Sequence, residues 1–138
     1  MKRSAAIVTV VPLLAIAYIV YQYLPAEWSA AQIAGLAILI AGMALVTLAR
    51  YQLADSFSIT PQATKLVTHG IYSRIRNPVY IFSAAALAGL VLFLDLPYLF
   101  LAFLILIPVQ ILRARAESRV LEQHFGEEYR RYRSTTWF

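Results

Sequence analysis

The residues of this chain best suited to chemistry gather in one polar stretch, residues 68–80, which leads into a long apolar run. The stretch contains His69, Tyr72, Arg76, Asn77 and Tyr80. An arginine can hold a carboxylate through two parallel N–H groups, and a tyrosine ring can face a cation. Asparagine does not titrate near neutral pH, so these residue types favour the binding of a charged ligand over proton transfer. Polar groups crowded at a membrane edge are costly unless something binds there, and we therefore expect the function here.

A second polar group, residues 113–132, follows the last apolar run. Its pattern predicts a helix that continues this run and carries Arg113 and Glu117 one turn apart. Four residues, spaced by four, four and three positions, form an apolar-aromatic stripe: Leu121, Phe125, Tyr129 and Tyr132. Gly126 predicts the end of this helix, and Glu127 suits the first turn of a second short one. The alternative is an amphipathic helix that lies on acidic lipid.

Four apolar runs must position these two groups. Residues 5–24 and 30–49 each comprise 20 residues without a charge, the length that a helix needs to cross about 30 Å of hydrocarbon. Residues 79–94 and 97–112 comprise 16 each, and Asp95 at their junction argues against one long helix. At about 1.5 Å per residue such helices reach only ~24 Å, so we expect them to continue past the hydrocarbon or to be locally recessed. The sequence thus predicts an all-α integral membrane protein with four transmembrane helices.

The placement of charge predicts the topology of these spans. All twelve lysines and arginines fall on one side of the four-span arrangement, and the two opposite connections hold only Glu27 and Asp95. The positive-inside rule then puts both termini, the loop 52–77 with its Lys65, and the tail 113–138 in the cytoplasm. Membrane orientation also explains the net charge of +5 without a nucleic-acid partner. The first run exceeds the apolar core of a signal peptide, so a retained anchor is expected.

Residues 1–138 are expected to form one membrane domain without repeats or a separate soluble part. The chain has no cysteine, so no disulfide, thiolate metal site or cysteine nucleophile is possible, and we predict no metal site. Pro12 and Pro108 are expected to kink their helices. Small residues four apart are expected to let helices approach closely. These pairs are Ala31 and Gly35, Ala37 and Ala41, and Ala85 and Gly89.

The two polar groups form a two-part pattern that brackets the last two apolar runs. The first half reads Leu66-Val67-Thr68-His69-Gly70-Ile71-Tyr72, then Arg76-Asn77-Pro78-Val79-Tyr80. The second half reads Glu117-Ser118-Arg119-Val120-Leu121, then Phe125-Gly126-Glu127-Glu128-Tyr129 and Tyr132. In order, spacing and location this pattern resembles the signature of the isoprenylcysteine carboxyl methyltransferase family and its phospholipid methyltransferase relatives. Three features depart from it: Asn77 replaces the usual histidine, Ser118 a common second glutamate, and the frequent closing Val-Pro is absent.

The resemblance implies transfer of a methyl group from S-adenosylmethionine to a lipophilic acceptor, such as a prenylcysteine-like carboxylate, at the cytoplasmic membrane face. In-line methyl displacement needs close reacting centres and exclusion of water more than acid-base help. Arg76 and Asn77 are the candidate catalytic residues by this resemblance, and Arg76 and Arg113 are the candidate substrate-binding residues. The implied cofactor site comprises His69, Gly70, Tyr72, Asn77, Pro78, Tyr80 and Glu117. The implied partners are the lipid bilayer and a lipophilic or lipidated acceptor.

Most of these residues also have a structural interpretation, which the sequence leaves open. Asn77 and Pro78 are a good helix start, with asparagine as N-cap and proline in the first turn. Glu117 can pair with a neighbouring arginine such as Arg113 on an exposed helix. His69 can simply hydrogen-bond to backbone. The tyrosines can anchor the chain at the membrane interface, and the arginines can contact lipid headgroups.

Both halves of the pattern border the third and fourth apolar runs. We therefore expect the loop 66–77 and the tail 113–132 to fold together over the cofactor, with a pocket that opens between these two helices. Three alternative functions remain: a phospholipid N-methyltransferase, a membrane reductase with a nicotinamide cofactor, and a non-catalytic protein that kept the fold. The closing motif of such reductases tends toward Tyr-Gly-x-x-Trp, so Phe125 and Tyr129 favour the methyltransferase.

Overall fold

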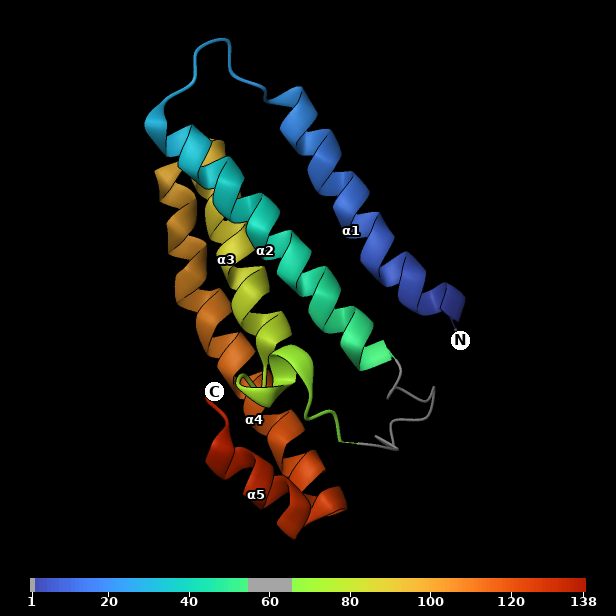
Figure 1. Ribbon diagram of the computed structural model, residues 1–138. Helices are drawn as coiled ribbons and strands as arrows, with labels where there is room; N and C mark the ends of the chain where they lie inside the picture. Colours follow the sequence, from blue (N-terminus) through green and yellow to red (C-terminus); the bar gives the residue numbers. More distant parts are fainter. Residues whose placement is uncertain (1, 55–65) are drawn as a thin grey trace.

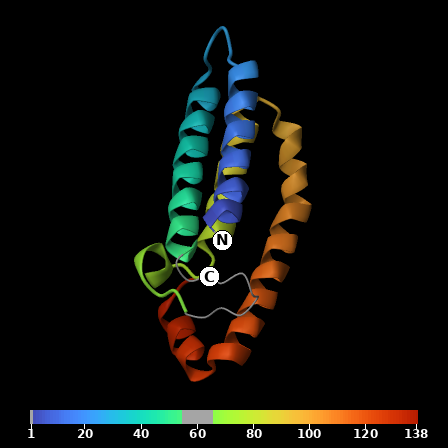
Figure 2. The ribbon, with the colours of Figure 1, turned by 90° about the vertical axis from the view of Figure 1, so that its right-hand side faces the viewer.

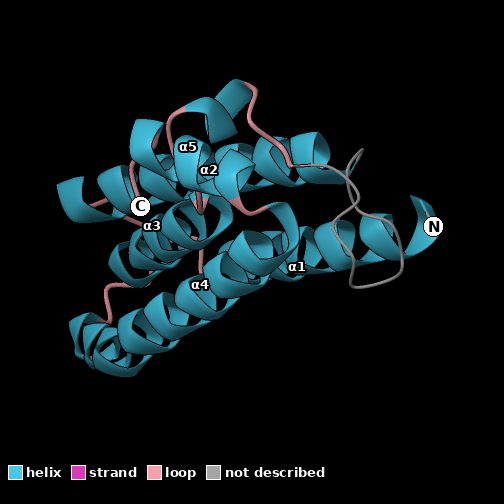
Figure 3. Cartoon of the chain, turned by 90° about the horizontal axis from the view of Figure 1, so that it is seen from below, coloured by secondary structure: helices cyan, strands magenta, loops and turns pink. Residues whose placement is uncertain are grey.

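The computed structural model describes residues 2–54 and 66–138, and its regular elements there are helices (Figure 1, Figure 3). The α-helices are α1 (Lys2–Gln22), α2 (Ala30–Ala54), α3 (Pro78–Phe93), α4 (Phe103–Phe125) and α5 (Glu127–Thr135). Two short 3-10 helices precede α3 and α4, namely η1 (Gly70–Ser73) and η2 (Pro97–Ala102). The predicted all-α class is confirmed for these residues. The topology prediction placed residues 52–77 in a cytoplasmic loop. Residues 55–65 of this loop, including Lys65, lie outside the described chain.

Two helical segments are long and apolar enough to cross a membrane, whereas the sequence predicted four. They are Ala30–Leu53 and Pro97–Phe125. The apolar helices Thr9–Gln22 and Pro78–Phe93 are shorter. The 16 residues of Pro78–Phe93 give a length of about 24 Å, less than the roughly 30 Å of a hydrocarbon core. The structure thus supports two of the four predicted spans.

A capping box starts α2. The Oγ of Ser29 accepts a hydrogen bond of 3.1 Å from the backbone N–H of Gln32, and the Oε1 of Gln32 accepts one of 3.1 Å from the backbone N–H of Ser29. From this start α2 runs past the predicted span 30–49 as far as Ala54. Gln52, expected in the loop, therefore lies on the last turn of this helix.

Glycines let α2 and α3 pack closely against each other. A Cβ added to Gly35 would lie 2.5 Å from the backbone nitrogen of Phe93, and one on Gly89 would lie 2.5 Å from that of Leu39. Small residues are therefore required at these two positions, as predicted. The alanines of α2 predicted for the same role are exposed instead: Ala31, Ala37 and Ala41.

A tight turn separates α3 from the fourth apolar helix, as Asp95 and Pro97 predicted. Asp95 adopts φ +55°, a left-handed conformation that aspartate tolerates better than most residues. Pro97 then begins η2, which leads into α4. Figure 2 shows α4 leaning away from α1, α2 and α3, and its side chains Leu104 and Ile105 are 73% and 72% exposed. These side chains suit a lipid environment.

The continuation of α4 beyond the apolar run is confirmed, and so is its end at Gly126. Gly126 adopts φ +52°, and nothing lies within 4 Å of the position a Cβ would take there. Backbone conformation, not space, therefore requires glycine at this position. The short helix α5 follows immediately with Glu127 and Glu128 in its first turn, where the helix dipole favours negative charge.

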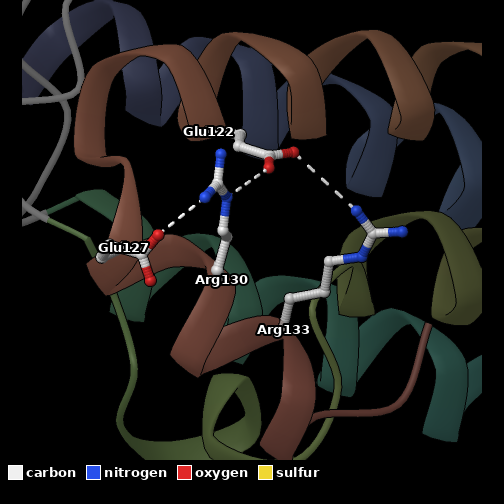
Figure 4. A network of polar contacts seen from close by, with 4 residues as sticks. All are labelled: Glu122, Glu127, Arg130 and Arg133. Carbon is white, nitrogen blue, oxygen red and sulfur yellow. Dashed lines mark hydrogen bonds and ion pairs between the residues drawn. The ribbon is translucent and has the colours of Figure 1, made fainter.

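Ion pairs link α4 and α5 across this corner (Figure 4). Arg130 binds Glu122 at 2.9 Å and Glu127 at 2.6 Å, and Arg133 lies 3.8 Å from Glu122. All of these pairs are at the surface, where ion pairs contribute little to stability. The buried contacts of α5 matter more for its position, because Tyr129 and Tyr132 pack with Leu66 in one apolar cluster.

Candidate functional site

The two halves of the sequence pattern meet where the start of α3 lies against α4. The hydroxyl of Tyr80, in the first turn of α3, donates a hydrogen bond of 2.5 Å to Oε1 of Glu117 on α4. One turn further along α3, the Oγ of Ser83 accepts a longer bond of 3.4 Å from Nε2 of Gln110 on α4. A polar strip thus joins the two helices. Sequence reasoning missed Ser83 and Gln110, although a polar residue within an apolar run was the available signal.

Glu117 is exposed, and its partner differs from the one that the structural interpretation predicted. Within the described chain it forms no ion pair with Arg113 or Arg119. Its Oε1 is held by Tyr80, while its Oε2 makes no hydrogen bond within the described residues. A carboxylate oxygen has two lone pairs, so Glu117 can accept hydrogen bonds from a ligand without losing Tyr80.

Tyr72 and Tyr132 form the buried side of this region. The hydroxyl of Tyr132 on α5 donates a hydrogen bond of 2.7 Å to the carbonyl oxygen of Tyr72 in η1, and both residues are buried. Burial raises the pKa of the Tyr72 hydroxyl above its usual range. Electrostatic interactions with Tyr132 and Glu117 raise this pKa further, whereas the positive charge of Arg50 lowers it. Burial likewise raises the pKa of Tyr132 to about 12, and Arg76 opposes that shift. Both hydroxyls are therefore neutral at physiological pH and do not act as bases.

The start of α3 is fixed by the residues that follow α5. The backbone N–H of Arg76 donates to the carbonyl of Trp137 at 3.1 Å, and that of Asn77 to the carbonyl of Phe138 at 3.0 Å. In return, the backbone N–H of Trp137 donates to the carbonyl of Arg74 at 2.7 Å. These contacts use main-chain groups that every residue carries, so no pattern of residue types marks them.

The side chain of Arg76 carries a donor that the described part of the chain does not use. Its Nε is buried and has no hydrogen-bond partner among residues 2–54 and 66–138. A buried N–H without an acceptor costs about 1–3 kcal/mol, and more for a charged group, so such a donor indicates a binding partner. A carboxylate fits a guanidinium through two parallel hydrogen bonds. Arg76 can therefore hold an anionic ligand group at the start of α3.

Asn77 and Pro78 occupy the N-cap and first positions of α3, as predicted. The amide of Asn77 makes no capping hydrogen bond, which leaves it for other contacts. Asn77 donates its own backbone N–H to the carbonyl of Phe138, and Pro78 has no N–H. The backbone nitrogen of Tyr80 donates to the carbonyl of Asn77. These backbone N–H groups are therefore not open to an anion.

His69 and Gly70 lie on the α2 side of η1. The backbone N–H of Ile71 donates to Oε1 of Gln52 at 3.0 Å, and a Cβ on Gly70 would lie 2.5 Å from the Gln52 amide. Gly70 also adopts φ +61°, so both conformation and space require glycine. His69 is exposed. Although His69 and Glu117 were both predicted to bind the cofactor, no hydrogen bond joins them in the described chain. The structure thus gives Gly70 a folding role, and a cofactor role for either residue stays a prediction.

Arg113 is exposed on α4, one turn before Glu117. Its predicted contact with the acceptor is untested. The apolar-aromatic stripe is confirmed, because Leu121 and Phe125 pack against the cluster of Leu66, Tyr129 and Tyr132. The loop that begins at Leu66 and the tail therefore fold together, as predicted.

The family comparison agrees with this arrangement. The sequence model described as phospholipid methyltransferase matches residues 30–128, well over half of the chain. The chain belongs to the phospholipid methyltransferase family. The match includes every candidate site residue from His69 to Glu117, and it marks the protein as a relative of membrane methyltransferases. No curated protein and no solved structure was found to match the chain.

Proposed function

We propose that this phospholipid methyltransferase family member transfers the methyl group of S-adenosylmethionine to a lipophilic acceptor at the cytoplasmic face of a membrane. The carrying observation is the hydrogen bond between Tyr80 and Glu117, because it joins the two halves of the family pattern in space. Family membership supports methyl transfer, and the two long apolar helices support a membrane location. By charge placement, both termini and the site face the cytoplasm.

The residues present fit the methyl donor chemically. Its carboxylate suits the Nε of Arg76, and its ribose hydroxyls suit the Oε2 of Glu117, two atoms without a hydrogen-bond partner among the described residues. Its positive sulfonium suits the faces of aromatic rings, which Tyr72 and Tyr80 supply on either side of Arg76 in sequence. When bound, S-adenosylmethionine supplies an electrophilic methyl group.

The protein's own residues then bind, orient and exclude water. Tyr80 orients the Glu117 carboxylate, and the tail holds the backbone of Arg76 and Asn77 in place. Neither Asn77 nor the neutral tyrosines take up a proton, so the acceptor must arrive as a nucleophile. A carboxylate already meets this condition, and we therefore propose a prenylcysteine-like carboxylate as acceptor. A phospholipid amine is the alternative and has to reach the site in its neutral form.

Calorimetric titration of the purified protein with S-adenosylmethionine and, separately, with NADPH tests the proposal. We expect saturable binding of the sulfonium compound, its loss in Glu117→Ala, and no change in the matched control Glu128→Ala, a surface glutamate of α5. Circular dichroism shows whether each variant is folded. Saturable binding of NADPH alone would indicate the reductase, and binding of neither compound by folded protein would indicate a non-catalytic member.

A further inference from the structure

A groove of about 180 Å³ lies between α1, α2 and α3. Most of its wall is apolar and includes Leu13 of α1, Met43 of α2 and Leu87 of α3. Four polar residues also line it, namely Thr9 of α1, Thr47 and Arg50 of α2, and Ser83 of α3. Thr9 belongs to the first half of α1, Thr47 and Arg50 to the last turns of α2, and Ser83 to the second turn of α3, so the polar residues lie toward one end of the groove.

The polar end of the groove adjoins the candidate site. Ser83 donates a hydrogen bond of 3.1 Å to the carbonyl oxygen of Tyr80 and is itself bound by Gln110. Arg50 lies close enough to Tyr72 to lower the pKa of its hydroxyl, against the effect of burial. The polar end of the groove therefore lies next to Tyr72 and to the backbone of Tyr80.

The composition of the wall selects one kind of ligand. An apolar surface favours a hydrocarbon chain, and the guanidinium of Arg50 favours an anionic group with several acceptor oxygens. A soluble anion would make no use of the apolar wall, and a neutral lipid would make no use of the charge of Arg50. An amphiphile with one hydrocarbon tail and a carboxylate head uses both.

We propose that this groove binds the tail of the acceptor and that Arg50 holds its carboxylate head beside Tyr72 and Tyr80. This inference rests on the proposed function and makes it specific, because it assigns a single-tailed anionic lipid to a defined place. It differs from the entrance between α3 and α4 that the sequence suggested. It also gives α1 a role, since α1 supplies one wall.

Photolabelling tests the groove directly. The full chain is placed in phosphatidylcholine nanodiscs with a trace of a photoactivatable palmitate analogue, and labelled peptides are mapped by mass spectrometry. We expect label on the groove faces of α1 and α2, displaced by palmitate better than by palmityl alcohol. In Met43→Trp or Leu13→Trp, which fill the groove, labelling should fall about tenfold, as in loss of a specific site. In Leu104→Trp, a matched change on the exposed face of α4, labelling should not change. Arg50→Gln should abolish the preference for palmitate over the alcohol.

Three results would overturn binding of the acceptor tail in the groove. They are label spread evenly over all lipid-facing residues, label concentrated between α3 and α4, and unchanged labelling in both Met43→Trp and Leu13→Trp. Titration of the same nanodiscs with S-adenosylmethionine separates the two claims. Labelling of the groove without binding of the methyl donor would overturn the proposed function alone. Binding of the methyl donor without labelling of the groove would overturn this inference alone.

Discussion

The hydroxyl of Tyr80 and the carboxylate of Glu117 are joined by a hydrogen bond of 2.5 Å across 37 positions of sequence. The contact links the first turn of α3 to the middle of α4, two helices that otherwise touch sparingly. It fixes one oxygen of Glu117 and leaves the other for a ligand. The two halves of the family pattern thus act as one site, and the arrangement can be tested residue by residue.

Replacing Tyr80 by phenylalanine removes the donor and keeps the ring. We expect the affinity for S-adenosylmethionine to fall about tenfold, because a hydrogen bond to a charged group contributes about 1.5–3 kcal/mol. The free energy of unfolding should change by less than about 1 kcal/mol, because the contact is exposed. Calorimetric titration and thermal unfolding measure the two effects. Tyr98→Phe, at an exposed residue of η2, is the control and should change neither.

Replacing Arg76 by lysine keeps the charge and removes the buried Nε. We expect binding of S-adenosylmethionine to weaken about tenfold, since an ammonium does not form the paired hydrogen bonds of a guanidinium. The exposed neighbour Arg74 provides the matched control Arg74→Lys, with unchanged binding expected. Equal affinities of the two variants in the same titration would remove Arg76 from the site.

Features that depend on neighbouring residues could be predicted from the sequence. Asn77 and Pro78 begin α3, the turn at Asp95 ends it, and Gly126 ends α4, because caps, prolines and left-handed glycines act within a few residues. The stripe that ends at Tyr132 could be predicted as well, since helical spacing places its members on one face.

Contacts between distant main-chain groups could not be predicted. The backbone of Trp137 pairs with residues 74 and 76, and Gln52 holds the amide of Ile71, without any residue pattern that marks them. Helix length was a further limit, because an apolar run does not show how far its helix extends: the structure supports two of the four predicted spans, and α3 has only 16 residues.

Replacing Tyr132 by phenylalanine leaves the buried carbonyl of Tyr72 without its donor. We expect a loss of about 1–3 kcal/mol in the free energy of unfolding. Denaturant unfolding measures it, with Tyr129→Phe as control, because the Tyr129 hydroxyl makes no hydrogen bond within the described chain. Equal losses in both variants would contradict a specific role for the Tyr132 hydroxyl.

The raised pKa of Tyr132 predicts that the free energy of unfolding decreases at alkaline pH. Its pKa is raised from 10.0 to about 12 in the folded protein, so the unfolded chain releases this proton first as the pH rises. The stability that the neutral hydroxyl contributes is complete below pH 10 and is lost as the pH rises through about 12. Thermal unfolding over this range should show a steeper loss in the wild type than in Tyr132→Phe. Parallel curves would contradict the assignment to this residue.

The substitution Gly89→Ala tests how closely α2 packs against α3. Alanine is usually the better helix former by about 1 kcal/mol, so a free helix would gain stability from Gly89→Ala. In this protein the new Cβ would lie 2.5 Å from the backbone nitrogen of Leu39, and we expect a net loss of roughly 1–3 kcal/mol. Thermal unfolding in detergent measures it, with Ala37→Leu on the exposed face of α2 as the control for added bulk. A gain in stability for Gly89→Ala would show that the two helices do not pack this closely.

Transfer of a labelled methyl group tests directly whether the protein methylates a lipophilic acceptor and whether this activity depends on Glu117. The purified protein is incubated with methyl-labelled S-adenosylmethionine and, in separate reactions, a prenylcysteine, phosphatidylethanolamine and a lipophilic carboxylic acid, and label is counted in the lipid fraction. The account predicts time-dependent label on an acceptor with the wild type and with Glu128→Ala, and background label with Glu117→Ala. Equal label with wild type and Glu117→Ala, or an unlabelled lipid fraction from folded wild-type protein with every acceptor, would contradict it.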